Sequence, residues 1–171
     1  MLFTLCCAVV VAAAGLPAQT TRMRITLPGF REPFSIEDVS SPFELAAPAG
    51  KSYPAVKAAL AELKVQLSVD DSAGGLLGNT KLVGMGSFLG YRLSRLLDCG
   101  DGATGPVADS YRLAIVFLVL LDPIDGARTK MRVGFIAGGQ DISGTSKIAV
   151  TCGSRGTIEE KLFQLTAKRL Q

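Results

Sequence analysis

Residues 99–152 decide the fold, and they contain three strand-like segments: YRLAIVFLVLL (111–121), KMRVGFIA (130–137) and KIAVT (147–151). The first segment is apolar at successive positions, so both of its faces must be covered, which is typical of a central strand. The second segment alternates apolar residues with polar or small ones, as a half-exposed strand does. Asp125-Gly126 between them is a hairpin signal. The stretch therefore predicts a three-stranded antiparallel meander.

A helix is predicted directly after the third strand. Thr157 and Glu160 have the spacing of a capping box, in which the hydroxyl caps the first turn and the carboxylate reaches back. An apolar stripe at helical spacing follows, made by Ile158, Leu162 and Leu165. We expect this C-terminal helix to lie across the sheet and to cover one face of residues 111–121.

An N-proximal helix is predicted from Ser52, which can cap free amide groups, with Pro54 tolerated in the first turn. Its apolar face consists of Val56, Ala59, Leu60 and Leu63. Further strands are predicted at 22–27, 43–46, 65–70 and 79–88, and a short helix at 91–97. Glycines within 79–88 indicate a bulge or a close backbone approach.

The predicted fold class is α+β. An antiparallel sheet of about five to six strands carries the N-proximal and C-terminal helices mainly on one face. The chain of 171 residues divides into a signal peptide (1–18), an N-terminal strand with an irregular segment (19–50) and a single α+β domain (51–171). Hydrophobic residues make up 48% of the chain, which is enough to fill a core of this size.

The first 18 residues, MLFTLCCAVVVAAAGLPA, have the pattern of a secretory signal with cleavage after Ala18. The run is short for a membrane span and ends in small residues. The usual basic n-region is missing, which leaves an uncleaved anchor or a lipid anchor as alternatives. Cys6 and Cys7 precede the apolar run, which disfavours the lipid anchor. We expect an exported protein, periplasmic or secreted, with no integral membrane span after cleavage.

Removal of the signal leaves two cysteines, Cys99 and Cys152. In an oxidising compartment an isolated pair is most simply a disulfide. The chain-entropy model gives such a bond about 4 kcal/mol of stabilisation. A zinc site is disfavoured because neither a histidine nor a CxxC pair accompanies them.

Composition argues against most chemistries. The formal net charge of +3 is too small and too scattered to predict a nucleic-acid partner. The chain has no histidine, the commonest general base and metal ligand. No G-x-S-x-G, S-x-x-K or phosphate-binding loop occurs. We therefore expect no enzyme and no cofactor, and an atypical hydrolase that uses carboxylates is the remaining catalytic alternative.

Two groups of residues are candidate ligand sites. A calcium site would use carboxylates in the Gly-rich loop around Cys99, namely Asp98, Asp101 and Asp109. An anion site would use the start of the C-terminal helix, with Ser154, Arg155 and Thr157. The competing interpretation is structural, because Asp residues are common in turns and hydroxyl residues cap helices.

Four motifs carry a resemblance to known proteins: YPAV (53–56), LDCG (97–100), ADSY (108–111) and CGSRG (152–156). With them, residues 53–170 resemble a group of uncharacterised bacterial exported proteins, which implies export but no particular activity. The order helix, sheet, helix is also similar to BamC-like (helix-grip) envelope domains. That similarity implies a role in the cell envelope, as a fold-level analogy.

The favoured function is that of an exported, non-catalytic domain that binds an envelope protein partner or supports an assembly. The alternative is a small-molecule or lipid carrier with a cavity between the sheet and the C-terminal helix. The residues expected to leave room for that cavity are Gly84, Gly86, Ala114 and Gly134. The sequence leaves the oligomeric state and the identity of any ligand open.

Overall fold

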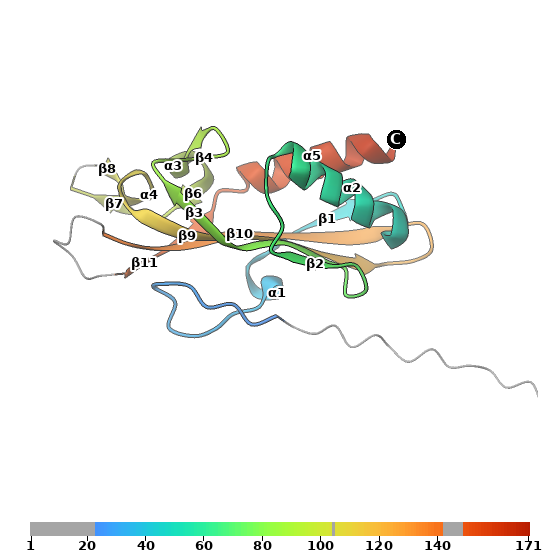
Figure 1. Ribbon diagram of the computed structural model, residues 1–171, viewed down its shortest axis with the longest axis horizontal. Coiled ribbons are helices and arrows are strands. Elements are labelled where there is room, and N and C mark those ends of the chain that lie inside the picture. Colours follow the sequence, from blue (N-terminus) through green and yellow to red (C-terminus); the bar gives the residue numbers. More distant parts are fainter. Residues whose placement is uncertain (1–22, 104, 142–148) are drawn as a thin grey trace, which may run out of the picture.

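The computed structural model describes residues 23–103, 105–141 and 149–171 (Figure 1). The helices are α1 (Ile36–Val39), α2 (Ala49–Glu62), α3 (Leu93–Leu96), α4 (Val107–Ser110) and α5 (Thr157–Leu170). The strands are β1 (Ser41–Leu45), β2 (Val69–Asp71), β3 (Leu76–Met85), β4 (Ser87–Phe88), β5 (Tyr91–Arg92), β6 (Leu97–Asp98), β7 (Asp101–Gly102), β8 (Gly105–Pro106), β9 (Arg112–Pro123), β10 (Thr129–Gln140) and β11 (Ala149–Ser154). The expected signal peptide and its cleavage point lie outside the described residues.

The main sheet is antiparallel, with strand order β5-β4-β3-β9-β10-β11-β6, and β1 and β2 pair with β10 and β3. β9 and β10 pair without a register shift from Pro123 opposite Thr129 to Arg112 opposite Gln140. β11 continues the meander along β10, although the first residues of the strand predicted at 147–151 lie outside the described part of the chain. The α+β class and the central position of β9 are confirmed.

The two long helices, α2 and α5, lie side by side on one face of the sheet (Figure 1). Beneath them Phe117 of β9 and Phe135 of β10 meet edge to face, with ring centroids 5.3 Å apart. Both rings are fully buried, as are Leu60 of α2 and Leu162 of α5. Burial of each such side chain contributes about 1.5–3 kcal/mol. This layer is the larger hydrophobic core.

The opposite face is covered by the N-terminal segment, residues 23–40, which includes α1 (Figure 1). Its apolar side chains, Ile25, Leu27, Phe34 and Ile36, pack on Val116, Leu118, Leu120 and Ile136 of the sheet. At Gly138 any side chain would collide with the backbone of Pro28, so the segment lies directly on β10. The second face of β9 is therefore closed by a segment that carries little regular structure.

Both expected helix caps are wrong. α2 begins at Ala49 with Pro48 as its N-cap, and Ser52 is buried, where its hydroxyl donates to the carbonyl of Ala47. α5 begins one residue earlier than the expected cap requires. Its N-cap is Gly156 at φ 80°, a conformation that favours glycine. Contacts with the rest of the fold decide where α2 and α5 begin, and the local spacing of residues does not predict these contacts.

Several expected elements differ in extent. The strand predicted at 22–27 is a single bridge between Ile25 and Phe34, because that segment crosses the face of the sheet instead of joining its edge. The strands predicted at 43–46, 65–70 and 79–88 correspond to β1, β2 and β3, of which β2 is only three residues long. The helix predicted at 91–97 is the four-residue α3 between β5 and β6.

The main sheet has nine strands within the described residues, against the expected five to six. The additional strands β4, β5 and β6 have two residues each, too few for an alternating pattern to indicate them. The closest backbone approach in β3 is at Gly78, just before the predicted stretch, where a side chain would collide with the carbonyl oxygen of Phe117; at Gly84 a side chain would meet the side chains of Ile115 and Leu93. A register shift between Asn79 and Leu82 supplies the bulge.

No helix in the described ranges is long and apolar enough to cross a membrane.

Candidate functional site

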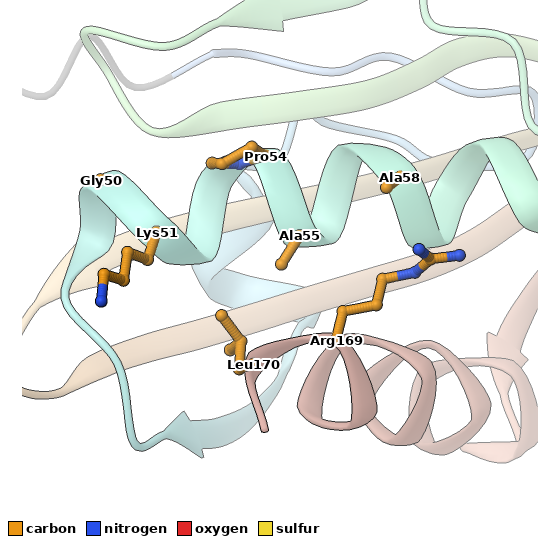
Figure 2. A pocket seen from close by; sticks show the side chains of 7 residues that line it. All are labelled: Gly50, Lys51, Pro54, Ala55, Ala58, Arg169 and Leu170. Atoms are coloured by element: carbon orange, nitrogen blue, oxygen red, sulfur yellow. The ribbon is translucent and has the colours of Figure 1, made fainter.

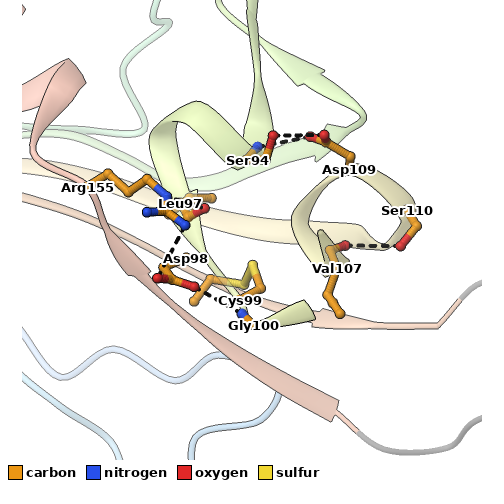
Figure 3. The surroundings of a disulfide bond; sticks show 10 residues. Ser94, Leu97, Asp98, Cys99, Gly100, Val107, Asp109, Ser110 and Arg155 are labelled. Atoms are coloured by element: carbon orange, nitrogen blue, oxygen red, sulfur yellow. Dashed lines mark hydrogen bonds and ion pairs between the residues drawn. A yellow bond between two sulfur atoms is a disulfide. The ribbon is translucent and has the colours of Figure 1, made fainter. Parts of the chain in front are cut away.

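The predicted disulfide between Cys99 and Cys152 is present (Figure 3). Cys99 directly follows β6, and Cys152 is a fully buried residue of β11. β6 and β11 are already neighbours in the sheet, with Asp98 opposite Gly153. The bond therefore fixes the segment that leaves α3 to the strand that leads into α5.

The residues of the expected anion site have partners within the chain. The guanidinium of Arg155 forms an ion pair with Asp98 at 3.2 Å (Figure 3), and its amide donates to the carbonyl of Leu96 at 2.9 Å. Thr157 donates its hydroxyl to the carbonyl of Arg95, and Ser154 accepts from the amide of Gly156. These contacts attach the start of α5 to α3 and β6, so they have a structural role.

A carboxylate of the chain itself lies at this helix start. Glu159 is buried, and its Oε2 atom has no hydrogen-bond partner among the described residues. Burial raises the pKa of Glu159 above its ordinary value of 4.5, while hydrogen bonds from Ser154 and the amides of Glu159 and Ile158 lower it in part. The shift of the N-cap to Gly156 makes Glu159, and not Glu160, the third residue of α5, which the sequence spacing missed.

The three aspartates of the expected calcium site are used separately. Asp109 accepts hydrogen bonds from the amide and hydroxyl of Ser94, at 2.9 and 2.8 Å (Figure 3). Asp98 pairs with Arg155, and Asp101 is exposed in β7. Within the part of the chain that the structure describes, no three His, Cys, Asp or Glu side chains are grouped to hold a metal ion. The arrangement gives the calcium hypothesis no support.

The small residues expected to open a cavity under α5 do not all face that helix. A side chain at Gly84 would be in contact with Leu93 and Ile115, which already occupy the space. Gly134 faces Ile36 and Val39 on the opposite side of the sheet. The carrier hypothesis gains no support from these positions.

A shallow groove of about 530 Å³ lies between the start of α2 and the end of α5 (Figure 2). Lys51 and Arg169 line its rim, and its walls are apolar, formed by Pro54, Ala55, Ala58 and Leu170. Arg169 forms an ion pair with Glu62 of α2, so one of the two cations that line the groove already joins the two helices. The groove reflects how the two helix ends diverge.

A more distinctive surface lies on the opposite face of the sheet, where cover by the N-terminal segment ends at Pro28. There the strand register places Val83, Ala114 and Gly138 in one row and Met85, Arg112 and Gln140 in the next. Opposed residues of an antiparallel pair share a face. We call the side chains of these rows, Val83, Met85, Arg112, Ala114 and Gln140, the open sheet face.

The open sheet face exposes large apolar side chains beside polar ones. Val83 is 53% exposed and Met85 is 61% exposed, although both lie on a sheet strand. Val83 and Pro28 border a groove of about 400 Å³, which Arg112, Gln140 and Asp141 also line. Met85 is opposite Arg112 in the strand register. Arg112 forms no ion pair with another residue in the described part of the chain.

This surface was missed at the sequence level. The alternation at 82–85 and the single Arg112 before an apolar strand were visible there. Their common face depends on the bulge in β3, which a sequence pattern does not locate. No protein-family model matches the chain, and no curated protein or solved structure is significantly similar to it.

Proposed function

We propose that this protein is an exported, non-catalytic domain of the cell envelope that binds a protein partner through the open sheet face. One observation carries the proposal: on the face of the sheet where the N-terminal segment packs, the neighbouring rows that contain Val83 and Met85 leave these large apolar side chains exposed. Contiguous exposed apolar groups beside polar ones are typical of interaction sites. The groove offers a contact surface whose lining includes the guanidinium of Arg112 and the carboxylate of Asp141.

Export is supported by the disulfide and by residues 1–18. Disulfides form and persist in oxidising compartments and are rare in the cytosol. The bond here joins two of the four cysteines, and the other two, Cys6 and Cys7, belong to the expected signal. The similarity in element order to BamC-like envelope domains favours the envelope as the site of action.

Site-specific photo-crosslinking in cells that export the chain tests the proposal. A photoreactive amino acid replaces Met85 in one variant and Ile124 in a control variant. Ile124 is also an exposed apolar residue, at 41%, but it lies in the β9–β10 turn at the other end of the sheet. We expect a covalent adduct with an envelope protein from position 85 and none from position 124.

A second variant guards against chance proximity. Val83→Asp, made in the Met85 crosslinking background, places a charge in the apolar row at an exposed position and should abolish the adduct without changing the melting temperature. Equal labelling from both positions, or an adduct that persists with Asp at position 83, would contradict the proposal. Cell fractionation with thiol alkylation checks export, since the Cys99–Cys152 bond should be formed in the exported fraction.

A further inference from the structure

We infer that the partner binds the open sheet face with an extended segment that presents apolar side chains and one carboxylate, and that Arg112 binds this carboxylate. The inference rests on the proposed function and specifies the chemistry of the partner. It is carried by three features of the described residues: the size of the open rows, the way the chain covers the rest of the same face, and the charge left at its centre.

The dimensions of the open rows suit a short segment. They span β3, β9 and β10, and adjacent strands lie about 4.8 Å apart, while alternate residues along a strand lie about 7 Å apart. Two rows across three strands therefore measure roughly 10 Å by 7 Å. A few residues of extended chain cover such an area, whereas a globular surface would also need contacts outside it.

The N-terminal segment shows what kind of layer this face accepts. Ile25 and Leu27, two residues apart, are both buried against the sheet, as alternate side chains of an extended chain can be. The layer ends where Pro28 meets Gly138, and Pro28 forms one wall of the groove. A partner segment placed on Val83 and Ala114 would continue the layer that the chain has begun.

The charge at the centre of the outer row selects an acidic segment. Arg112 lies between Met85 and Gln140 in the strand register, and it is an exposed residue. A guanidinium forms two parallel hydrogen bonds with a carboxylate, and these are stronger where apolar groups exclude water. The amide of Gln140 can supply a further hydrogen bond.

The same charge count disfavours an anionic membrane as the occupant. Binding to anionic lipid surfaces usually depends on clusters of about 4–8 Lys or Arg residues. Arg112 is the one Lys or Arg among the residues that line the groove. The lining also contains one carboxylate, that of Asp141, which already has an interaction within the chain. With one cation and one carboxylate the lining has no net charge to attract an anionic surface, and Arg112 is suited to one carboxylate at a defined position.

Peptide selection tests the inference directly. A display library of random 12-residue peptides is selected on the exported protein, and on variants Arg112→Glu and Lys130→Glu. Lys130 is a matched control, because it is exposed and alternates in β10 onto the same face as Gln140, at the far end of the strand. Thermal melts verify that both variants fold.

We expect the peptides selected on the unmodified protein and on Lys130→Glu to contain apolar residues and an Asp or Glu. Selection on Arg112→Glu should replace the acidic residue by Lys or Arg. The chain has no tryptophan, so Met85→Trp supplies a fluorescence probe for the affinity of the best peptide. Changing the peptide's carboxylate to its amide, or Arg112 to Gln, should weaken binding about 10- to 100-fold, as loss of a charged hydrogen bond does.

Other outcomes overturn the inference and separate it from the proposed function. Selected peptides without an acidic preference contradict it, and so does an acidic preference that survives Arg112→Glu. If position 85 crosslinks to an envelope protein in cells under either result, the proposed function stands and only the partner chemistry is wrong. Arg112-dependent binding to vesicles of anionic phospholipid, or adducts between two copies of this chain, would assign the surface to a different occupant.

Discussion

Opening the disulfide between Cys99 and Cys152 should lower the stability of the protein by an amount that its position in the chain sets. The two cysteines are 53 residues apart in sequence. The loss of loop-closure entropy in the unfolded chain then corresponds to about 4 kcal/mol at 25 °C. For a domain of this size each kcal/mol shifts the melting temperature by about 2–4 °C, so the expected decrease is about 8–16 °C.

Two perturbations should agree. One is reduction of the unmodified protein with dithiothreitol, and the other is the double variant Cys99→Ala, Cys152→Ala. Alanine is chosen because Cys152 is fully buried, and serine would bury a hydroxyl without an assured partner. Urea and thermal unfolding are measured with and without reductant, and the double variant should not respond to the reductant.

The reasoning has a clear point of failure. Alkylation with a mass tag shows whether both thiols are free in the reduced sample. If they are free and the melting temperature equals that of the oxidised protein, the cross-link does not restrict the unfolded chain, and its assignment as a structural link between β6 and β11 is wrong. A melt that separates into two transitions would instead show that the bond holds only a local segment.

Three further substitutions test the packing and the buried charge. Gly138→Ala should lower the free energy of unfolding in urea by about 1–3 kcal/mol, because its methyl group would collide with Pro28; Gly50→Ala, where no atom lies within 4 Å, is the control and should not destabilise. Phe117→Ala should cost about 3–5 kcal/mol in the same assay, and a smaller loss would mean that the space under the helices is loosely filled. Glu159→Gln should stabilise the protein near neutral pH and have little effect in acid. Burial raises the pKa of Glu159 in the folded state above 4.5, so the folded state is favoured while the carboxyl is protonated, and this stability is lost as the pH rises through the folded-state pKa. Urea unfolding across this pH range checks the sign, and a destabilised variant at neutral pH contradicts it.

The sequence was sufficient for the elements with strong periodic or compositional signals. Residues 111–121 are apolar on both faces, and they form the central strand β9 with a hydrophobic core on each side. The C-terminal helix is α5, and the cysteine pair is bonded. The strand and the helix follow from the spacing of apolar residues within a short segment, and the disulfide follows from the number of cysteines.

The predictions that depended on contacts between distant segments were less successful. Ser52 and Thr157 have the spacing of helix caps, yet their hydroxyls donate to Ala47 and Arg95. Residues 19–50 were interpreted as a strand and an irregular segment, but residues 23–40 pack on one face of the sheet, and β1 pairs with β10. The hydroxyls of Ser52 and Thr157 and the apolar side chains of the N-terminal segment each had several possible partners, and the tertiary fold determines which of them they contact.

The sequence by itself therefore determined the α+β class, the central strand, the terminal helix and the disulfide. These depend on the period of apolar residues and on the cysteine count, which are properties of the chain alone. Only the tertiary structure decided where cover of the sheet ends, and so which residues form the open sheet face. That boundary arises because Pro28 meets Gly138 and because the bulge in β3 brings Val83 and Met85 beside Arg112, and no local preference encodes either contact.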